Sequence, residues 1–194
     1  MMLEEENYAL GFLDSYFLRL KKAQEFVDLD EVSELFLKLL EIRRSDSTLF
    51  LAGNGGSAST SQHFAVDLGI GGIGRNSIIR SICLSDNQSS ITAIANDISF
   101  DSIFAAQLSV LGKDTDTLMV ISASGNSTNL ISAVNQAKQI GLKTLGLLGF
   151  DGGELRAICD YSVLVETNIG EYGIVEDIHL SICHALTEAL RRTD

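Results

Sequence analysis

The sequence of 194 residues contains no proline and few basic residues. The absence of proline excludes rigid linkers and polyproline segments. Lys and Arg together number 14, against 26 Asp and Glu, which gives a net charge of −12. This balance argues against a nucleic-acid partner, because proteins bind phosphate backbones through basic surfaces. An acidic protein can still bind a small anion through backbone N–H groups and hydroxyls.

Long apolar runs are also missing, and cysteines are few. No run approaches the roughly 20 residues that cross a membrane, and the segment Met1–Glu6 is acidic where a secretory signal is basic. Cys83, Cys159 and Cys183 are odd in number, far apart and without a Cys-x-x-Cys pair, which argues against disulfides and a thiolate zinc site. We therefore expect a cytoplasmic protein with no membrane partner.

The composition is that of a folded chain, with 45% apolar and 21% charged residues. Its length suits a single domain over residues 1–194, divided into N-terminal helices (1–45) and an α/β core (46–194). In the first part apolar residues recur at helical spacing. The interruption at Asp28–Asp30 predicts two helices, with Asp30 as N-cap of the second.

The remaining chain alternates short apolar runs with helical patterns. Strands are expected at Thr48–Ala52, Ile78–Leu84, Thr117–Ile121, Leu142–Leu148 and Tyr161–Val165. Helices are expected over about 89–96, 100–111, from Ser127 to Ile140, and 174–192. Strands that are apolar throughout and separated by helices are typical of a parallel sheet covered on both faces. The predicted fold is therefore a doubly wound α/β domain with a five-stranded parallel sheet and an N-terminal helical extension.

Two of these strands end in loops of unusual composition, Gly53–Ser57 and Ser122–Ser127. Glycines let backbone N–H groups point outward, a helix N-terminus adds partial positive charge, and serine hydroxyls donate hydrogen bonds, so both loops are candidate phosphate sites. The alternatives are a tight turn at the first loop and ordinary N-capping by Ser124 or Ser127 at the second. Neither loop is a dinucleotide or Walker motif, so no nucleotide cofactor is indicated.

Histidines are the next candidates for chemistry. His63 and Asp67 are four residues apart on the helix after the first loop and face the same way. His184 lies on the last helix, where Glu176 is eight residues away, about 12 Å along the axis. Those two side chains could share an ion only by reaching toward each other, or with ligands from a second subunit. The alternative for each histidine is a structural or surface role.

Six segments then occur in order and with characteristic gaps: Leu51–Ser57, Gln62–Ala65, Ala95–Asp97, Ile121–Ser127, Asp151–Gly153, and Glu176–His179 followed by His184. Together they resemble the sugar isomerase (SIS) domain and, within it, the phosphoheptose isomerase family. The resemblance implies a homotetramer with active sites at subunit interfaces. It also implies conversion of sedoheptulose 7-phosphate to D-glycero-D-manno-heptose 7-phosphate, for the heptose of lipopolysaccharide or capsule.

The resemblance also implies roles for individual residues. Substrate and phosphate contacts fall on Asn54, Gly55, Gly56, Ser57, Asn96, Asp97, Ser122, Ala123, Ser124, Ser127 and Glu176. One zinc ion per subunit would be bound by His63, Asp67, Glu176 and His184. In the expected enediol mechanism Asp67, or Glu176 in its place, is the base and His184 the acid.

The chain departs from the family pattern at several positions. Asp67 stands where glutamate is usual, Glu176 where glutamine is usual, and Ala123 where threonine is usual. The segment Gly69–Arg75 replaces a stretch that is often rich in arginine. Asp67 is one methylene shorter than glutamate, and near-attack geometry is sensitive to shifts of about 1 Å.

Two other functions fit the same resemblance. One is a non-catalytic regulator, because the family includes a protein that binds a replication initiator and lacks the catalytic carboxylate and the final histidine. The other is a sensor that binds a sugar phosphate without turnover. The present chain keeps both histidines and carboxylates at the remaining ligand positions, which favours the enzyme.

Overall fold

The computed structural model describes residues 2–45, 47–74 and 77–193. Its sheet has five strands, all parallel, in the order β2-β1-β3-β4-β5. The strands are β1 (Thr48–Gly53), β2 (Arg80–Cys83), β3 (Thr117–Ser122), β4 (Lys143–Phe150) and β5 (Tyr161–Glu166). The predicted doubly wound parallel sheet is confirmed.

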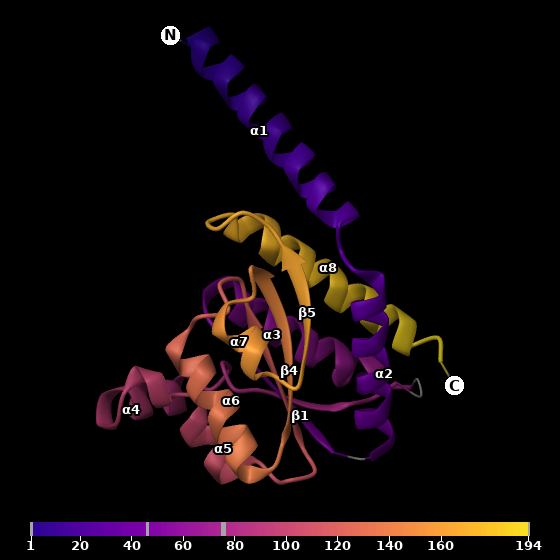
Figure 1. The fold of residues 1–194 in the computed structure, drawn as a ribbon, viewed down its shortest axis with the longest axis vertical. Helices are drawn as coiled ribbons and strands as arrows, with labels where there is room; N and C mark the ends of the chain where they lie inside the picture. Colours follow the sequence, from indigo (N-terminus) through magenta and orange to yellow (C-terminus); the bar gives the residue numbers. More distant parts are fainter. Residues whose placement is uncertain (1, 46, 75–76, 194) are drawn as a thin grey trace.

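Helices cover both faces of this sheet (Figure 1). The α-helices are α1 (Met2–Glu25), α2 (Leu29–Ser45), α3 (Gly55–Leu68), α4 (Gln88–Asp97), α5 (Ala105–Leu111), α6 (Thr128–Ile140), α7 (Gly153–Ile158) and α8 (Tyr172–Leu190). Two 3₁₀ turns, η1 (Ile70–Gly72) and η2 (Phe100–Ser102), complete the described elements. α2, α3 and α8 pack on one face, and α5, α6 and α7 on the other.

Strand β1 shows how the sequence makes two apolar layers. All six of its residues are buried, and neighbouring side chains of a strand point to opposite faces. Leu49 and Leu51 accordingly join the core beneath α2, α3 and α8. Phe50 and Ala52 join the core beneath α5, α6 and α7. The uninterrupted apolar run Leu49–Ala52 is thus the consequence of burial on both sides.

The two N-terminal helices differ in their packing. In α2, Leu35 and Leu39 are fully buried in the core, whereas α1 extends away from the body of the domain (Figure 1). The predicted N-cap of α2 is wrong by two residues. The Asp28 carboxylate accepts hydrogen bonds from the backbone N–H groups of Asp30 (2.9 Å) and Glu31 (3.2 Å). The cap is Asp28 because it directly precedes the first helical residue, within reach of the second and third amides.

Other expected boundaries shift slightly. The edge strand β2 is shorter than predicted because it pairs with β1 alone, from Arg80 to Cys83. The single helix expected over 100–111 is divided into η2 and α5. The division of the chain at residue 46 remains a prediction, and residues 1, 46 and 194, which bound it, lie outside the described part. No described helix is both long and apolar enough to cross a membrane. The three cysteines are free.

Candidate active site

The two glycine- and serine-rich loops meet at the point where the strand order reverses. From β1 the chain crosses to the edge strand β2 and then returns to β3 on the other side of β1. Ligands of open parallel sheets bind at such switch points, beyond the carboxyl ends of the strands. A pocket of about 110 Å³ lies there, lined by Asn54, Ser57, Ile121, Ser122, Ala123, Ser124, Ser127, Leu130, Tyr172 and Glu176.

Two glycines shape the backbone around this pocket. Gly55 (φ 53°) and Gly125 (φ 65°) adopt left-handed conformations, which cost other residues about 1–2 kcal/mol. A Cβ on Gly125 would also lie 1.9 Å from the carbonyl oxygen of Gly152. The second loop can therefore close against Gly152 only with glycine at position 125. The N-termini of α3 and α6 adjoin the loops, where free amides favour an anion.

The serines of the second loop are held by backbone amides but do not cap α6. The Ser122 hydroxyl accepts a hydrogen bond from the N–H of Gly125 (3.0 Å), and that of Ser124 accepts from Asn126 (3.3 Å). Ser127 is the N-cap residue of α6, yet its side chain makes no capping hydrogen bond. Ordinary capping thus does not explain the serines, and each hydroxyl still has a proton to donate to an anion.

A pair of amides connects the first loop to α6. Asn54 donates a hydrogen bond to Asn129 and receives one from it, both at 2.9 Å. Asn129 is buried. The Asn54 side chain, predicted to contact substrate, is thus used to hold the two loops together.

Glu176 reaches the pocket from α8. Its carboxylate lies against Gly56, where a Cβ would approach the glutamate oxygen Oε2 to 2.3 Å. Burial, and then the neighbouring Asp177 carboxylate, raises the pKa of Glu176. Glu176 therefore lines this pocket with a carboxyl group that protonates more readily than usual.

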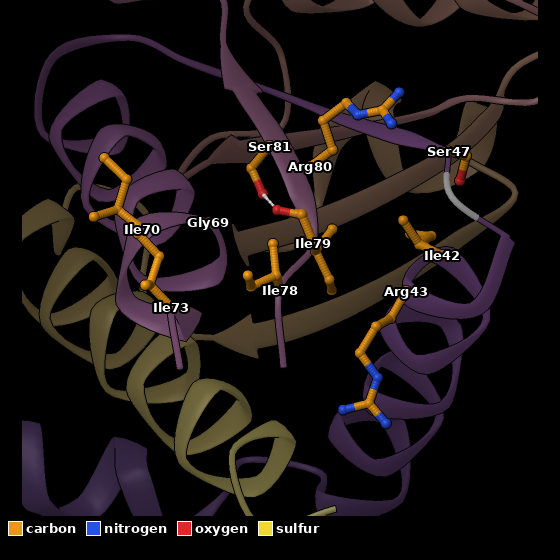
Figure 2. A pocket seen from close by; sticks show the side chains of 10 residues that line it. All are labelled: Ile42, Arg43, Ser47, Gly69, Ile70, Ile73, Ile78, Ile79, Arg80 and Ser81. Carbon is orange, nitrogen blue, oxygen red and sulfur yellow. Dashed lines mark hydrogen bonds between the residues drawn. The ribbon is translucent and has the colours of Figure 1, made fainter. Parts of the chain in front are cut away.

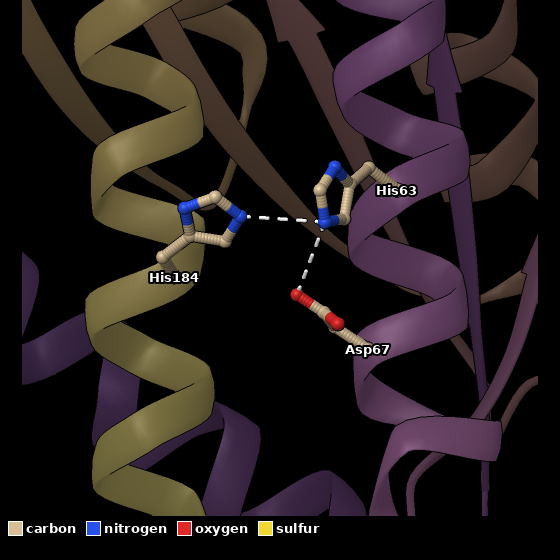
Figure 3. Close-up of side chains that lie close together, drawn as sticks. All are labelled: His63, Asp67 and His184. Carbon is tan, nitrogen blue, oxygen red and sulfur yellow. Dashed lines mark hydrogen bonds and ion pairs between the residues drawn. The ribbon is translucent and has the colours of Figure 1, made fainter.

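Further along the same two helices, three other predicted residues come together (Figure 3). The Nε2 atoms of His63 on α3 and His184 on α8 are 3.3 Å apart. Asp67 Oδ2 lies 3.6 Å from His63 Nε2. One ligand atom from each residue lies within 4.8 Å of the others. Both imidazoles are exposed and Asp67 is partly buried.

The spacing of this cluster fits a metal ion. Ligand nitrogens about 2.0–2.1 Å from a tetrahedral zinc ion are about 3.3 Å from each other, the separation found between His63 and His184. Two imidazoles and a carboxylate are also a donor set that suits catalytic zinc, which keeps a fourth position open. Glu176, the fourth predicted ligand, is not in the cluster, because its carboxylate lies at Gly56.

Other predicted residues lie elsewhere. Asn96 and Asp97 are exposed at the end of α4, where the Asn96 amide donates to the Asp97 carboxylate (2.8 Å). They line neither the pocket nor the histidine cluster of this chain. Two residues that the sequence did not indicate also belong here: Tyr172 lines the pocket, and Asn129 lies beside it. An isolated tyrosine or asparagine gives no signal in the sequence that distinguishes it from a surface residue.

A second pocket of about 480 Å³ lies beside the amino ends of β1 and β2 (Figure 2). Five of its ten lining residues are isoleucines, and Arg43 and Arg80 also line it. Arg43 donates to the backbone oxygens of Leu190 and Thr193 at the end of α8. Because this pocket lies at the amino ends of β1 and β2, it is not where an open parallel sheet binds its ligand.

Comparisons with known proteins identify the family of this chain. A family model described as SIS domain matches residues 14–149. A phosphoheptose isomerase of Helicobacter pylori is 37% identical over 158 residues, 79% of this chain and 79% of that protein. One of Chlorobaculum parvum is 37% identical over 177 residues, 89% and 83% of the two chains. The solved structure of phosphoheptose isomerase from Neisseria gonorrhoeae has a TM-score of 0.82 and 30% identity, covering 97% of this chain and 99% of that one. The resemblance carried by the six sequence segments is confirmed.

Proposed function

The chain belongs to the phosphoheptose isomerase family of SIS-domain proteins, and we propose that it interconverts sedoheptulose 7-phosphate and D-glycero-D-manno-heptose 7-phosphate. The phosphate would bind between Ser57, Ser124 and Ser127, with further contacts from the amides of Gly55 and Gly56. The context of this reaction is the synthesis of heptose for lipopolysaccharide or capsule.

One observation supports this substrate above all. α3 and α8 run side by side in the same direction, from the Gly56–Glu176 contact to the His63–His184 contact. These contacts are seven residues apart on α3 and eight on α8, so they are separated by about 10–12 Å. An extended seven-carbon sugar, with six carbon–carbon bonds of about 1.5 Å and a terminal phosphate ester, has a comparable length. Its phosphate would thus contact the serines while its carbonyl lies beside the histidines.

The proposed reaction transfers protons between neighbouring carbons. A carboxylate removes one proton from C1 of the ketose while an acid gives one to the carbonyl oxygen on C2, which forms the enediol. Return of a proton to C2 and loss of one from the oxygen on C1 then gives the aldose. Asp67 is the proposed base and His184 the proposed acid.

Glu176 is the alternative base. Its carboxylate lines the proposed phosphate pocket, so it would act at C1 only after turning away from Gly56 toward the histidines. Its raised pKa favours proton exchange closer to neutral pH. Which carboxylate acts as the base depends on whether Asp67, one methylene shorter than glutamate, reaches C1 of the substrate from its position 3.6 Å from His63.

We also propose one zinc ion per subunit, bound by His63, Asp67 and His184, with Glu176 as a further ligand if its side chain turns away from Gly56. When bound, the ion would supply positive charge that polarises the substrate carbonyl. The three residues of the cluster would at the same time orient the carbonyl end of the sugar.

The proposed assembly is a homotetramer with active sites at its interfaces. The support is the exposed apolar surface of α1, with Leu10, Phe12, Phe17 and Leu18 each more than half exposed. Such a surface is typical of an interaction site. The proposed location is the cytoplasm, where free thiols such as those of this chain persist.

The experiment is NMR of sedoheptulose 7-phosphate with purified protein in deuterated buffer, with zinc supplied. Formation of the aldose and incorporation of deuterium on C1 and C2 are expected. If neither occurs, the isomerase proposal is wrong. Metal analysis of the unaltered protein and of His63→Ala tests the zinc site separately, with stoichiometric zinc expected in the first and a loss in the second. Capture of a replication initiator by a metal-free protein would favour the regulator instead.

A further inference from the structure

Arg191, which directly follows α8, lies beside the histidine cluster formed by His63, Asp67 and His184. Its Nη2 lies 3.7 Å from Asp67 Oδ1, and its Nη1 lies 3.3 Å from Glu188 Oε1. The Arg191 side chain is 20% exposed, and its Nε is buried without a hydrogen-bond partner among the described residues. The guanidinium is therefore largely withdrawn from water and directed at the Asp67 carboxylate. An arginine buried to this extent loses hydration, and it is retained where a carboxylate offsets that cost.

A glycine provides the space that this guanidinium occupies. A Cβ on Gly71, in the turn after α3, would lie 2.7 Å from Arg191 Nη2 and 3.6 Å from Asp67 Oδ1. Any larger residue at position 71 would compete with the guanidinium for its position. Glycine at position 71 thus leaves room for the side chain of Arg191, which lies far away in the sequence, after α8.

The two oxygens of Asp67 consequently face different partners. Oδ1 is directed toward Arg191, at 3.7 Å, and Oδ2 toward His63 Nε2, at 3.6 Å. A carboxylate held by one oxygen in this way presents the other in a defined direction. Partners of this kind orient metal ligands in other proteins, and their loss typically lowers metal affinity or activity 10- to 100-fold.

We propose that Arg191 is a positioning residue that holds Oδ1 of Asp67, so that Oδ2 points into the space between His63 and His184. The inference rests on the role given to Asp67 in the proposed function. Arg192 provides the natural comparison, since its Nη2 lies 3.3 Å from the same Glu188 but its side chain is 80% exposed. No ion pair between Arg192 and Asp67 is present in the described part of the chain.

Zinc affinity of the full-length protein is the first test, measured by competition with a chromogenic chelator. Arg191→Met is expected to weaken zinc binding about 10-fold, because Asp67 loses its fixed direction. Charge alone predicts the opposite result, since removal of a cation near the ion would tighten binding. Arg191→Lys should bind zinc more tightly than Arg191→Met, and Arg192→Met should match the unaltered protein within about twofold. Equal zinc affinity of Arg191→Met and the unaltered protein would overturn the proposal, as would equal affinity of the Met and Lys variants.

Crystal structures of metal-free protein supply a second test that does not depend on zinc or on turnover. In Arg191→Met the Asp67 carboxylate is expected to turn away from His63, and Gly71→Ala should cause the same change by displacing Arg191. Asp67 in its original orientation in both variants would overturn the proposal. If the unaltered protein shows neither isomerisation nor zinc binding, the proposed function fails, whereas the orientation of Asp67 still decides whether Arg191 positions it.

Discussion

Asn54 and Asn129 hydrogen-bond to each other through both of their amide groups, at 2.9 Å in each direction. Asn54 follows β1 and is the N-cap residue of α3, whereas Asn129 lies in the first turn of α6, which follows the serine loop. The hydrogen bonds therefore join the two halves of the proposed phosphate pocket across 75 residues of sequence. Two loops that belong to different βα units are thus connected directly by this pair of side chains, forming one cradle.

Replacement of Asn129 by alanine should damage this cradle. Asn129 is 1% exposed, and its loss leaves the Asn54 amide without its partner, which costs about 1–3 kcal/mol. We expect a decrease of that size in the free energy of unfolding, measured with urea, and a higher KM for the sugar phosphate. Asn135→Ala is the matched control, because Asn135 is an exposed residue of the same helix. Equal stability of the two variants would contradict the prediction.

The pocket could be predicted from the sequence because its signals are local. Glycines and serines directly after buried strands indicate an anion site at the carboxyl edge of the sheet, and Gly53–Ser57 and Ser122–Ser127 lie there. The pairing of His63 with Asp67 follows in the same way from four-residue spacing on a helix. These features need no knowledge of how distant elements pack.

The remaining features depend on packing between elements far apart in sequence. His184 meets His63 because α8 packs beside α3, and no spacing in the sequence encodes that contact. Glu176 is directed to the proposed phosphate pocket because Gly56 has no Cβ to exclude its carboxylate. Arg191 approaches Asp67 for a similar reason at Gly71. Spacing on the last helix made His184 and Glu176 candidates, but only the family resemblance placed them in one site with His63 and Asp67.

Gly125→Ala should disrupt the serine loop. The new Cβ would require both a left-handed backbone, at φ 65°, and an approach of 1.9 Å to the Gly152 oxygen. We expect a loss of about 2–4 kcal/mol in the free energy of unfolding, and weaker binding of inorganic phosphate in calorimetry.

Gly141→Ala separates the cost of the left-handed backbone from the cost of the contact with Gly152. Gly141 is also left-handed, at φ 100°, but its nearest neighbour to a Cβ is the Asp114 side chain at 3.3 Å. Backbone strain alone should cost about 1–2 kcal/mol there, with phosphate binding unchanged. A cost at Gly125 no larger than that at Gly141 would show that the contact with Gly152 is unimportant.

Glu176→Gln should strengthen the binding of phosphate. The carboxylate lines the same pocket as Ser57 and Ser124, so its negative charge opposes an anion, and its removal should lower the Kd for inorganic phosphate about 3- to 10-fold at pH 7. The raised pKa of Glu176 predicts that this advantage declines as the pH falls and the native carboxyl becomes neutral.

Asp177→Asn makes the same change of charge at the next residue, which is exposed and does not line the pocket. Calorimetric titrations of both variants at pH 7 and pH 5 provide the comparison. Phosphate binding by Glu176→Gln that is no tighter than binding by Asp177→Asn would exclude a direct effect of the Glu176 charge.

The buried His179 should make the fold sensitive to acid. It is fully buried on α8, and burial lowers its pKa from 6.5 to about 4. Below pH 6.5 His179 takes up a proton in the unfolded chain but remains neutral in the folded chain. The titration of His179 therefore does not lower the free energy of unfolding above pH 6.5. As the pH falls below 6.5 it lowers this free energy, by on the order of 3 kcal/mol at about pH 4.

His179→Leu removes this titration while it keeps an apolar side chain of similar size in the core. Urea unfolding at pH 7, 6, 5 and 4.5 should show that the unaltered protein loses stability more steeply than the variant over this range. Carboxylates titrate in both proteins, so the difference between the two curves isolates the histidine. Parallel curves would mean that His179 is protonated in the folded protein, and that its neighbours stabilise the charge rather than exclude it.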